Sequence, residues 1–146
     1  MSRFSLIFIG SFTLLIILFS FLNIIYSYYL NLFLNINTYF IIFLLTLTIG
    51  LFLIFFKRIN FKKINIYEKI LIVIIGYLFF PVIISLPFYF SINNISYLNS
   101  YFEAISGFTS TGFSIFDNIK QLDQSLIIWR SSSQWIGGLY FLFSLL

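Results

Sequence analysis

Four long apolar segments dominate the sequence, and they restrict it to a membrane-embedded, helical fold. They cover residues 4–29, 38–56, 70–90 and 125–146. A transmembrane helix needs about 20 mostly apolar residues, and a backbone in lipid must satisfy its own hydrogen bonds, which favours helices. Only 8% of the residues are charged, against about 25% in soluble domains. We therefore predict an all-α membrane protein with four transmembrane helices.

The first segment resembles a signal peptide only superficially. A signal peptide has an apolar core of about 7–15 residues followed by an A-x-A-like cleavage site. The apolar core here is longer and no such site follows it. We expect an uncleaved helix.

The sequence contains neither cysteine nor histidine, which excludes several kinds of chemistry. Disulfides and thiolate metal sites are ruled out, and the commonest general base is absent. The net charge of +4 does not indicate nucleic-acid binding, because most basic residues lie in one connection. We expect a protein that is not an enzyme and that has no organic cofactor and no nucleic-acid partner.

That basic connection sets the expected orientation in the membrane. Residues 57–69 contain one acid, Glu68, and five basic residues: Lys57, Arg58, Lys62, Lys63 and Lys69. The positive-inside rule places them in the cytoplasm, and counting back through two helices places Arg3 there too. We expect a multi-pass protein of the plasma (cell inner) membrane, surrounded by lipid, with a cytoplasmic N-terminus. A contact between the basic residues and lipid head groups or a partner protein is the alternative to a purely solvated connection.

A polar stretch, residues 101–114, separates the third and fourth apolar segments. Before it, Pro87 is expected to mark the exit of the third helix, because proline kinks or ends a helix. Ser100 and Glu103 fit the S-x-x-E capping pattern, which predicts a short helix over residues 101–108. The small residues 109–112 then form a loop. The resulting order predicts two N-terminal helices in residues 1–60, and a helix, a re-entrant half-helix with its filter loop, and a helix in residues 61–146.

The half-helix and loop suit a dehydrated cation. A half-helix entering from the outer face directs its C-terminal end, with a partial negative charge, into the membrane. The backbone carbonyls of Thr109, Ser110, Thr111 and Gly112 would follow as ligands, since rings of carbonyls can replace the hydration shell of potassium. Glycine at position 112 permits a positive φ. An ordinary external loop is the alternative.

Two charged residues and two glycines are expected to support this loop. An arginine in the membrane costs about 2.5–3.5 kcal/mol on insertion scales and is usually paired. We predict that Arg130 pairs with Glu103 and ties the half-helix to the last segment. Snorkelling of Arg130 to the outer surface and simple capping by Glu103 are the alternatives. Gly137 and Gly138 permit close approach of another helix.

Two blocks of sequence resemble a known family. F-E-A-I-S-G-F-T-S-T-G-F-S and W-R-S-S-S-Q-W-I-G-G are similar to the first pore repeat of the Trk/Ktr/HKT superfamily of potassium transporters, in particular its TrkH-like members. Those proteins read F-E-A-x-S-G-x-T-T-T-G and x-W-R-S-x-x-Q-W-x-G-G. The similarity covers about residues 102–138, and earlier helices agree in layout only.

The resemblance implies transport of potassium, sometimes sodium, through a filter of four non-identical loops. Ser110, Thr111 and Gly112 would be the filter residues that bind potassium, with Thr109 just below them. Cytoplasmic nucleotide-binding regulatory subunits would be partners. Phe113 departs from the family pattern, which usually has a smaller residue there.

The family folds four pore repeats from several hundred residues, whereas this sequence contains one. We therefore expect the N-terminal portion of a potassium (monovalent cation) uptake protein, which acts with the remaining repeats or with other copies. The alternatives are a small non-conducting membrane protein that binds and regulates a partner, and a homotetrameric channel.

Overall fold

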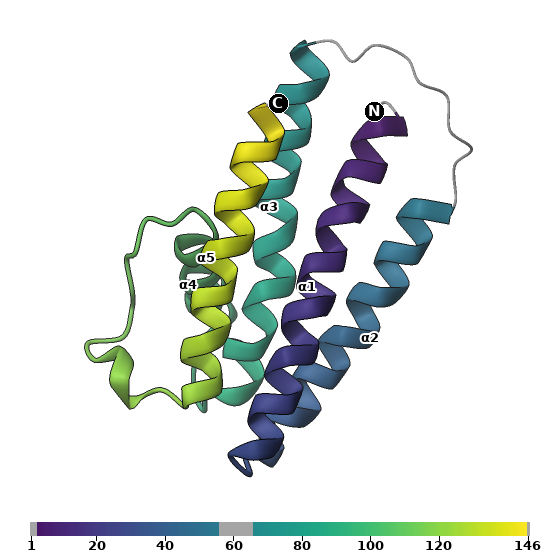
Figure 1. The fold of residues 1–146 in the computed structure, drawn as a ribbon. Coiled ribbons are helices and arrows are strands. Elements are labelled where there is room, and N and C mark those ends of the chain that lie inside the picture. Colours follow the sequence, from purple (N-terminus) through teal and green to yellow (C-terminus); the bar gives the residue numbers. More distant parts are fainter. Residues whose placement is uncertain (1–2, 56–65, 146) are drawn as a thin grey trace.

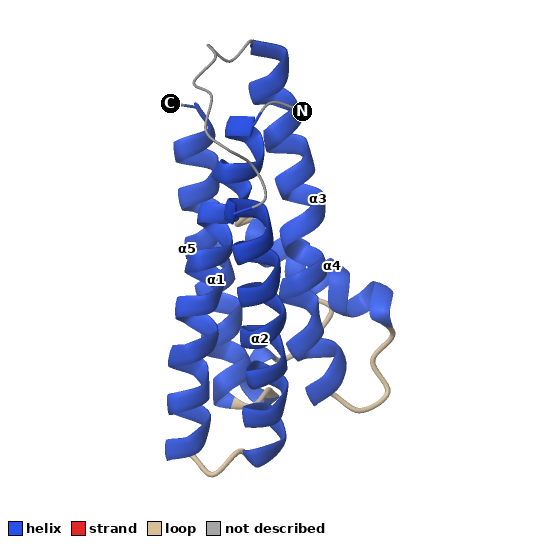
Figure 2. Cartoon of the chain, turned by 90° about the vertical axis from the view of Figure 1, so that its right-hand side faces the viewer, coloured by secondary structure: helices blue, strands red, loops and turns tan. Residues whose placement is uncertain are grey.

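The computed structural model describes the backbone of residues 3–55 and 66–145, where helices are joined by turns and loops and no strand is present (Figure 1). The elements are α1 (Arg3–Tyr29), α2 (Phe33–Phe55), α3 (Ile66–Ser91), α4 (Tyr97–Phe108), the short 3₁₀ helix η1 (Ile119–Gln121) and α5 (Gln124–Leu145). The four long helices lie side by side as a bundle. The short α4 packs against α3 and α5 on one side, and its loop projects there (Figure 2).

Three of these helices are long and apolar enough to cross a membrane. The candidate spans are Ile9–Tyr29, Asn35–Leu53 and Lys69–Ser91. Helix α5 is not among them, because Gln124, Arg130, Gln134 and several serines lower its hydropathy. The all-helical membrane class expected from the sequence therefore holds. The basic residues Lys57, Arg58, Lys62 and Lys63 lie outside the described residues.

Two helix boundaries differ from the sequence prediction. The second helix begins at Phe33 instead of residue 38, because a tight turn at Asn31, with φ of 58°, is sufficient to reverse the chain. The third helix begins at Ile66 instead of residue 70, and it continues through Pro87 to Ser91, close to its predicted end at residue 90. Membrane helices tolerate proline where neighbouring groups satisfy the freed backbone. The carbonyl that Pro87 frees is that of Ile83, and the Trp129 indole donates to the neighbouring Ile84 carbonyl at 2.9 Å, which holds this turn of α3 against α5.

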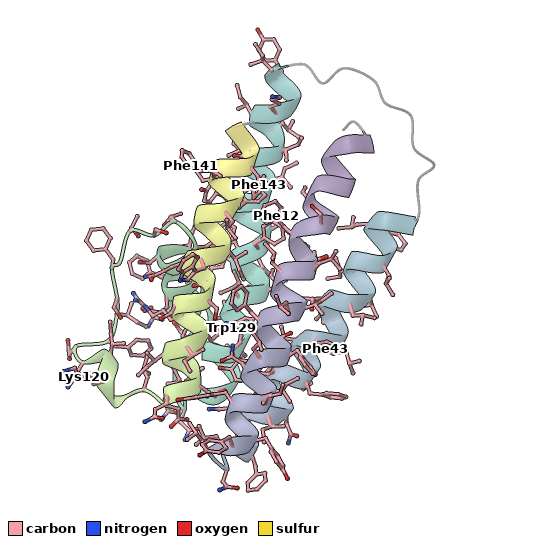
Figure 3. The ribbon with its side chains drawn as sticks, in the orientation of Figure 1. Phe12, Phe43, Lys120, Trp129, Phe141 and Phe143 are labelled. Carbon is pink, nitrogen blue, oxygen red and sulfur yellow. The ribbon has the colours of Figure 1, made fainter. Side chains whose placement is uncertain are left out.

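An aromatic cluster holds four helices together. Tyr140 of α5 contacts the ring of Phe12 on α1 with centroids 5.0 Å apart, and that of Phe80 on α3 at 5.3 Å. Phe108, the last residue of α4, lies 5.8 Å from the same ring. Figure 3 shows Phe12 between α1 and the α3–α5 pair. Such pairs contribute about 0.5–1.5 kcal/mol beyond their buried area, so the end of α4 is fixed in the core.

Gly76 of α3 makes room for the Tyr140 ring, which predicts a measurable effect of enlarging it. A Cβ at Gly76 would overlap the Tyr140 ring, and Tyr140 is fully buried with its hydroxyl donating to the Ile72 carbonyl at 2.6 Å. We expect Gly76→Ala to lower the free energy of unfolding by about 1–3 kcal/mol, as overpacked cores do. Thermal unfolding of the chain in detergent micelles measures this. A wild-type melting temperature in Gly76→Ala would contradict the close contact between α3 and α5.

Candidate ion-binding loop

Helix α4 carries the loop, and it begins one turn earlier than the sequence suggested. Its N-cap is Ser96, whose side chain accepts a hydrogen bond from the Asn99 amide at 3.2 Å. The proposed capping box of Ser100 and Glu103 is therefore wrong. Ser100 is buried inside the helix and donates to the Ser96 carbonyl at 3.2 Å, and Glu103 points to α5 instead. Serine is a suitable cap residue at either position. Ser96 is the cap here because Ser100 is buried within the helix.

After Phe108 the chain turns back on the end of α4. The amides of Thr109, Ser110 and Thr111 donate to carbonyls in the last turns of the helix, at 2.8, 2.9 and 3.1 Å. Ser110 and Gly112 adopt positive φ values of 57° and 80°. A Cβ at Gly112 would meet nothing within 4 Å, so glycine is favoured there by its backbone conformation and not by crowding.

The four residues predicted as ligands form one exposed run along this loop. Thr109, Ser110, Thr111 and Gly112 are all exposed. Within the described part of the chain, the carbonyls of Thr109, Ser110 and Thr111 accept no hydrogen bond, and that of Gly112 accepts only a long one of 3.5 Å from Arg130. The loop therefore has peptide oxygens available to a ligand.

The ion pair predicted from the sequence is present beneath this loop. Arg130 Nε lies 2.5 Å from Glu103 Oε1, and the Glu103 side chain is fully buried. The same carboxylate accepts hydrogen bonds from the Ser114 hydroxyl and the Ile115 amide, each at 3.1 Å. One buried carboxylate thus joins α4, α5 and the chain that leaves the loop.

Arg130 and Ser106 also fix the backbone just beyond Gly112. Arg130 Nη2 donates to the Phe113 carbonyl at 3.0 Å, and the Ser106 hydroxyl donates to the same oxygen at 2.5 Å. Ser106 contacts the Thr111 hydroxyl as well, at 3.1 Å. The Phe113 carbonyl is consequently engaged within the protein, whereas its side chain is 69% exposed. The usable run of carbonyls ends at Gly112.

Ser106 and Ser114 support the loop, although neither was predicted from the sequence to do so. A signal for Ser106 existed, because it lies three residues after Glu103 and therefore on the same face of the helix. Ser114 had no such signal. Its position follows from the turn at Gly112, which returns the chain past Glu103.

Of the two adjacent glycines in α5, one permits a close contact with α4. A Cβ at Gly137 would overlap the Phe108 carbonyl, whereas one at Gly138 would meet nothing within 4 Å. Gly138 instead borders an open groove of about 480 Å³ next to the loop. The groove is lined by Val73, Tyr77, Phe108, Thr109, Ser110, Gly137, Gly138 and Phe141.

Several known membrane transporters are similar to part of this chain. An uncharacterized cation transporter of Methanocaldococcus jannaschii is 32% identical over 77 residues, which is 53% of this chain and 16% of that protein. The Trk system potassium uptake protein TrkH of Escherichia coli K12 is 30% identical over 98 residues, 66% of this chain and 20% of TrkH. The resemblance to Trk-type potassium transporters is confirmed. TrkI of Halomonas elongata is 38% identical over 55 residues, 38% of this chain and 11% of TrkI.

The similarity to the Trk-type proteins is partial. The matched part is a fifth or less of the length of each of these relatives. No family model and no solved structure matches the chain. The relatives therefore connect the chain to cation transport across membranes, and the loop geometry must support any finer assignment.

Proposed function

We propose that this chain is the N-terminal part of a Trk-type potassium uptake protein and that it supplies one loop of a potassium filter. In this proposal residues 1–60 are two N-terminal spans, and residues 61–146 form a helix, a re-entrant half-helix with its loop, and a fourth span. Helix α5 is that fourth span, and its Arg130 is tolerated in the membrane because Glu103 pairs with it. Permeation makes and breaks no covalent bond, so no catalytic residue is assigned.

The observation that carries the proposal is a run of exposed residues, with peptide oxygens that accept no hydrogen bond or only a long one, at the C-terminal end of a packed half-helix. The end of α4 has a partial negative charge, which favours a cation. Several neutral oxygens can replace the water around potassium, and the carbonyls of Thr109, Ser110, Thr111 and Gly112 are available for this. One loop supplies only part of a ring. The rest would come from further repeats of the same transporter or from other copies.

The proposed orientation follows from the charges. The basic connection between α2 and α3 lies in the cytoplasm, as does the N-terminus, in a plasma (cell inner) membrane. Exposed Asp117, Lys120 and Asp123 then lie on the outer face, together with the entrance to the loop. A nucleotide-binding regulatory subunit would contact the cytoplasmic side.

A chimera tests the proposed function directly. Residues 66–145 of this chain replace the first-repeat segment of Escherichia coli TrkH, in cells that lack their own potassium uptake systems. We expect growth in low-potassium medium and uptake of radioactive rubidium. Gly112→Val in the chimera should abolish both, because a β-branched residue is strongly disfavoured at a φ of 80°, and rotation of the backbone would redirect the neighbouring carbonyls.

The control for this experiment is Lys120→Ala, which changes an exposed side chain in the chain beyond the loop. It should leave rubidium uptake unchanged, with equal amounts of each chimera in the membrane. Uptake that is the same in Gly112→Val as in the unmodified chimera would contradict the proposal.

A further inference from the structure

A second group of oxygen atoms is buried near the turn between α1 and α2, away from the loop described above. It contains Asn23 and Ser27 of α1 and Asn35 and Tyr39 of α2, each at most 1% exposed. Asn23 Oδ1, Ser27 Oγ, Asn35 Oδ1 and the Tyr39 hydroxyl have no hydrogen-bond partner in the described part of the chain. A buried polar atom left unpaired costs about 1–3 kcal/mol. Four of them in one region point to a bound ligand.

The pairing of α1 with α2 brings these four residues together. The two helices are antiparallel, and a Cβ on Gly50 would touch the Thr13 hydroxyl, so residues 13 and 50 face each other. Counting from this contact toward the turn places Ser27 within one residue of the level of Asn35, and Asn23 within one residue of the level of Tyr39. The four side chains therefore occupy two consecutive levels of the hairpin.

The start of α5 closes this group on one side. The Asn35 amide nitrogen donates to the Ser125 hydroxyl at 2.7 Å and to Asp123 Oδ2 at 3.2 Å. The Tyr39 side chain lies near Ser125 and the Asp123 carboxylate, although its hydroxyl makes no hydrogen bond of ordinary geometry. Ser125 is buried and Asp123 is exposed, so the carboxylate lies where the group meets the surface. Figure 1 shows this end of the bundle, where the α1–α2 turn lies next to the beginning of α5.

The oxygen atoms available in this group indicate which class of ligand it can bind. The unpaired atoms are two amide oxygens and two hydroxyl oxygens, and the one charged neighbour is a single carboxylate. Oxygen ligands select hard cations. The single carboxylate would neutralise a cation that carries one positive charge. Calcium sites normally combine several carboxylates, and no group of three His, Cys, Asp or Glu occurs among the described residues.

We propose that Asn23, Ser27, Asn35, Tyr39, Ser125 and Asp123 form a binding site for a monovalent alkali cation between the N-terminal hairpin and α5. The bound cation joins residues of α1 and α2 to the start of α5, so it stabilises the docking of the hairpin against the rest of the bundle. The site uses different residues from the loop at Thr109–Gly112, and it does not depend on the function proposed for that loop.

Thermal unfolding of the 146-residue chain in detergent micelles tests this proposal. The melting temperature is measured in sodium chloride, potassium chloride and choline chloride at equal ionic strength. We expect at least one alkali salt to raise the melting temperature by about 3 °C over choline, as a ligand near ten times its dissociation constant would do for a chain of this size. The sodium and potassium arms identify the preferred ion.

Four variants locate the effect. Asp123→Asn removes the charge at an exposed position and should abolish the difference between alkali salt and choline, and Tyr39→Phe should reduce it. Ser91→Ala removes another hydroxyl that is buried and unpaired among the described residues, outside this group, and should keep the difference. Thr111→Val alters the other loop and should also keep it. The proposal is overturned if alkali salts and choline give the same melting temperature, which would mean that water alone fills the group, or if Asp123→Asn retains the full difference.

Discussion

Replacing Arg130 by glutamine is expected to lower the free energy of unfolding by about 3–5 kcal/mol, because it leaves an uncompensated charge in the interior. The Glu103 carboxylate is fully buried, and Arg130 is the cation that pairs with it. Glutamine also removes the guanidinium donor of the Phe113 carbonyl. Thermal and denaturant unfolding in detergent micelles, followed by circular dichroism, measures the loss.

Two further variants separate the charge from the geometry. Glu103→Gln combined with Arg130→Gln should recover part of the stability, because no unpaired charge remains. Arg130→Lys should fall between the wild type and Arg130→Gln, since lysine keeps the charge but lacks the planar set of donors that reaches two partners at once. A stability of Arg130→Gln within about 1 kcal/mol of the wild type would contradict the assigned role, because that is the range of an exposed ion pair.

The same pair also predicts an effect on transport in the TrkH chimera. Arg130→Lys keeps the charge but not the second hydrogen bond, so the backbone at Phe113 should lose a constraint while the chimera remains folded. We expect rubidium uptake per folded molecule to fall, whereas a purely structural role would leave uptake per folded molecule unchanged.

Gly137→Ala is expected to destabilise the chain strongly, whereas Gly138→Ala should leave its stability unchanged or raise it slightly. A Cβ at Gly137 would overlap the Phe108 carbonyl, which belongs to the backbone and cannot rotate away. Overpacking of this kind costs about 1–3 kcal/mol or more. At Gly138 the added methyl group enters open space, and alanine is the better helix former by about 1 kcal/mol.

The adjacent positions make this a matched comparison, because both variants add one methyl group to the same helix. The difference between their melting temperatures in micelles is the quantity to measure. Equal melting temperatures, or a lower value for Gly138→Ala, would contradict the close packing of α5 on the end of α4.

The sequence was most informative where a buried charge has few possible partners. Arg130 lies in an apolar segment, and the chain has only four acidic residues, so Glu103 was a natural partner. Gly112 was singled out because glycine permits a positive φ in a loop that presents its carbonyls, and its φ is 80°. The approximate extents of α1 and α3 followed from their apolar length alone.

Other features depended on packing that the sequence does not display. Asn35 was expected before the second helix and Thr38 at its first residue, yet both lie inside α2 and are buried. Ser96 replaced Ser100 as the N-cap because α4 buries Ser100 against its neighbours. The oxygen group of the α1–α2 hairpin required the register of two helices, which becomes visible only when Thr13 is placed opposite Gly50.

The central claim is that peptide oxygens of residues 109–112 bind a dehydrated potassium ion, and the TrkH chimera soaked in rubidium salt tests it most directly. Anomalous scattering locates rubidium, which substitutes for potassium, without assumptions about the protein. The account predicts an anomalous peak in coordination contact with the carbonyls of Thr111 and Gly112. A map in which this loop is well ordered, rubidium peaks occur elsewhere and none lies at these carbonyls would contradict it.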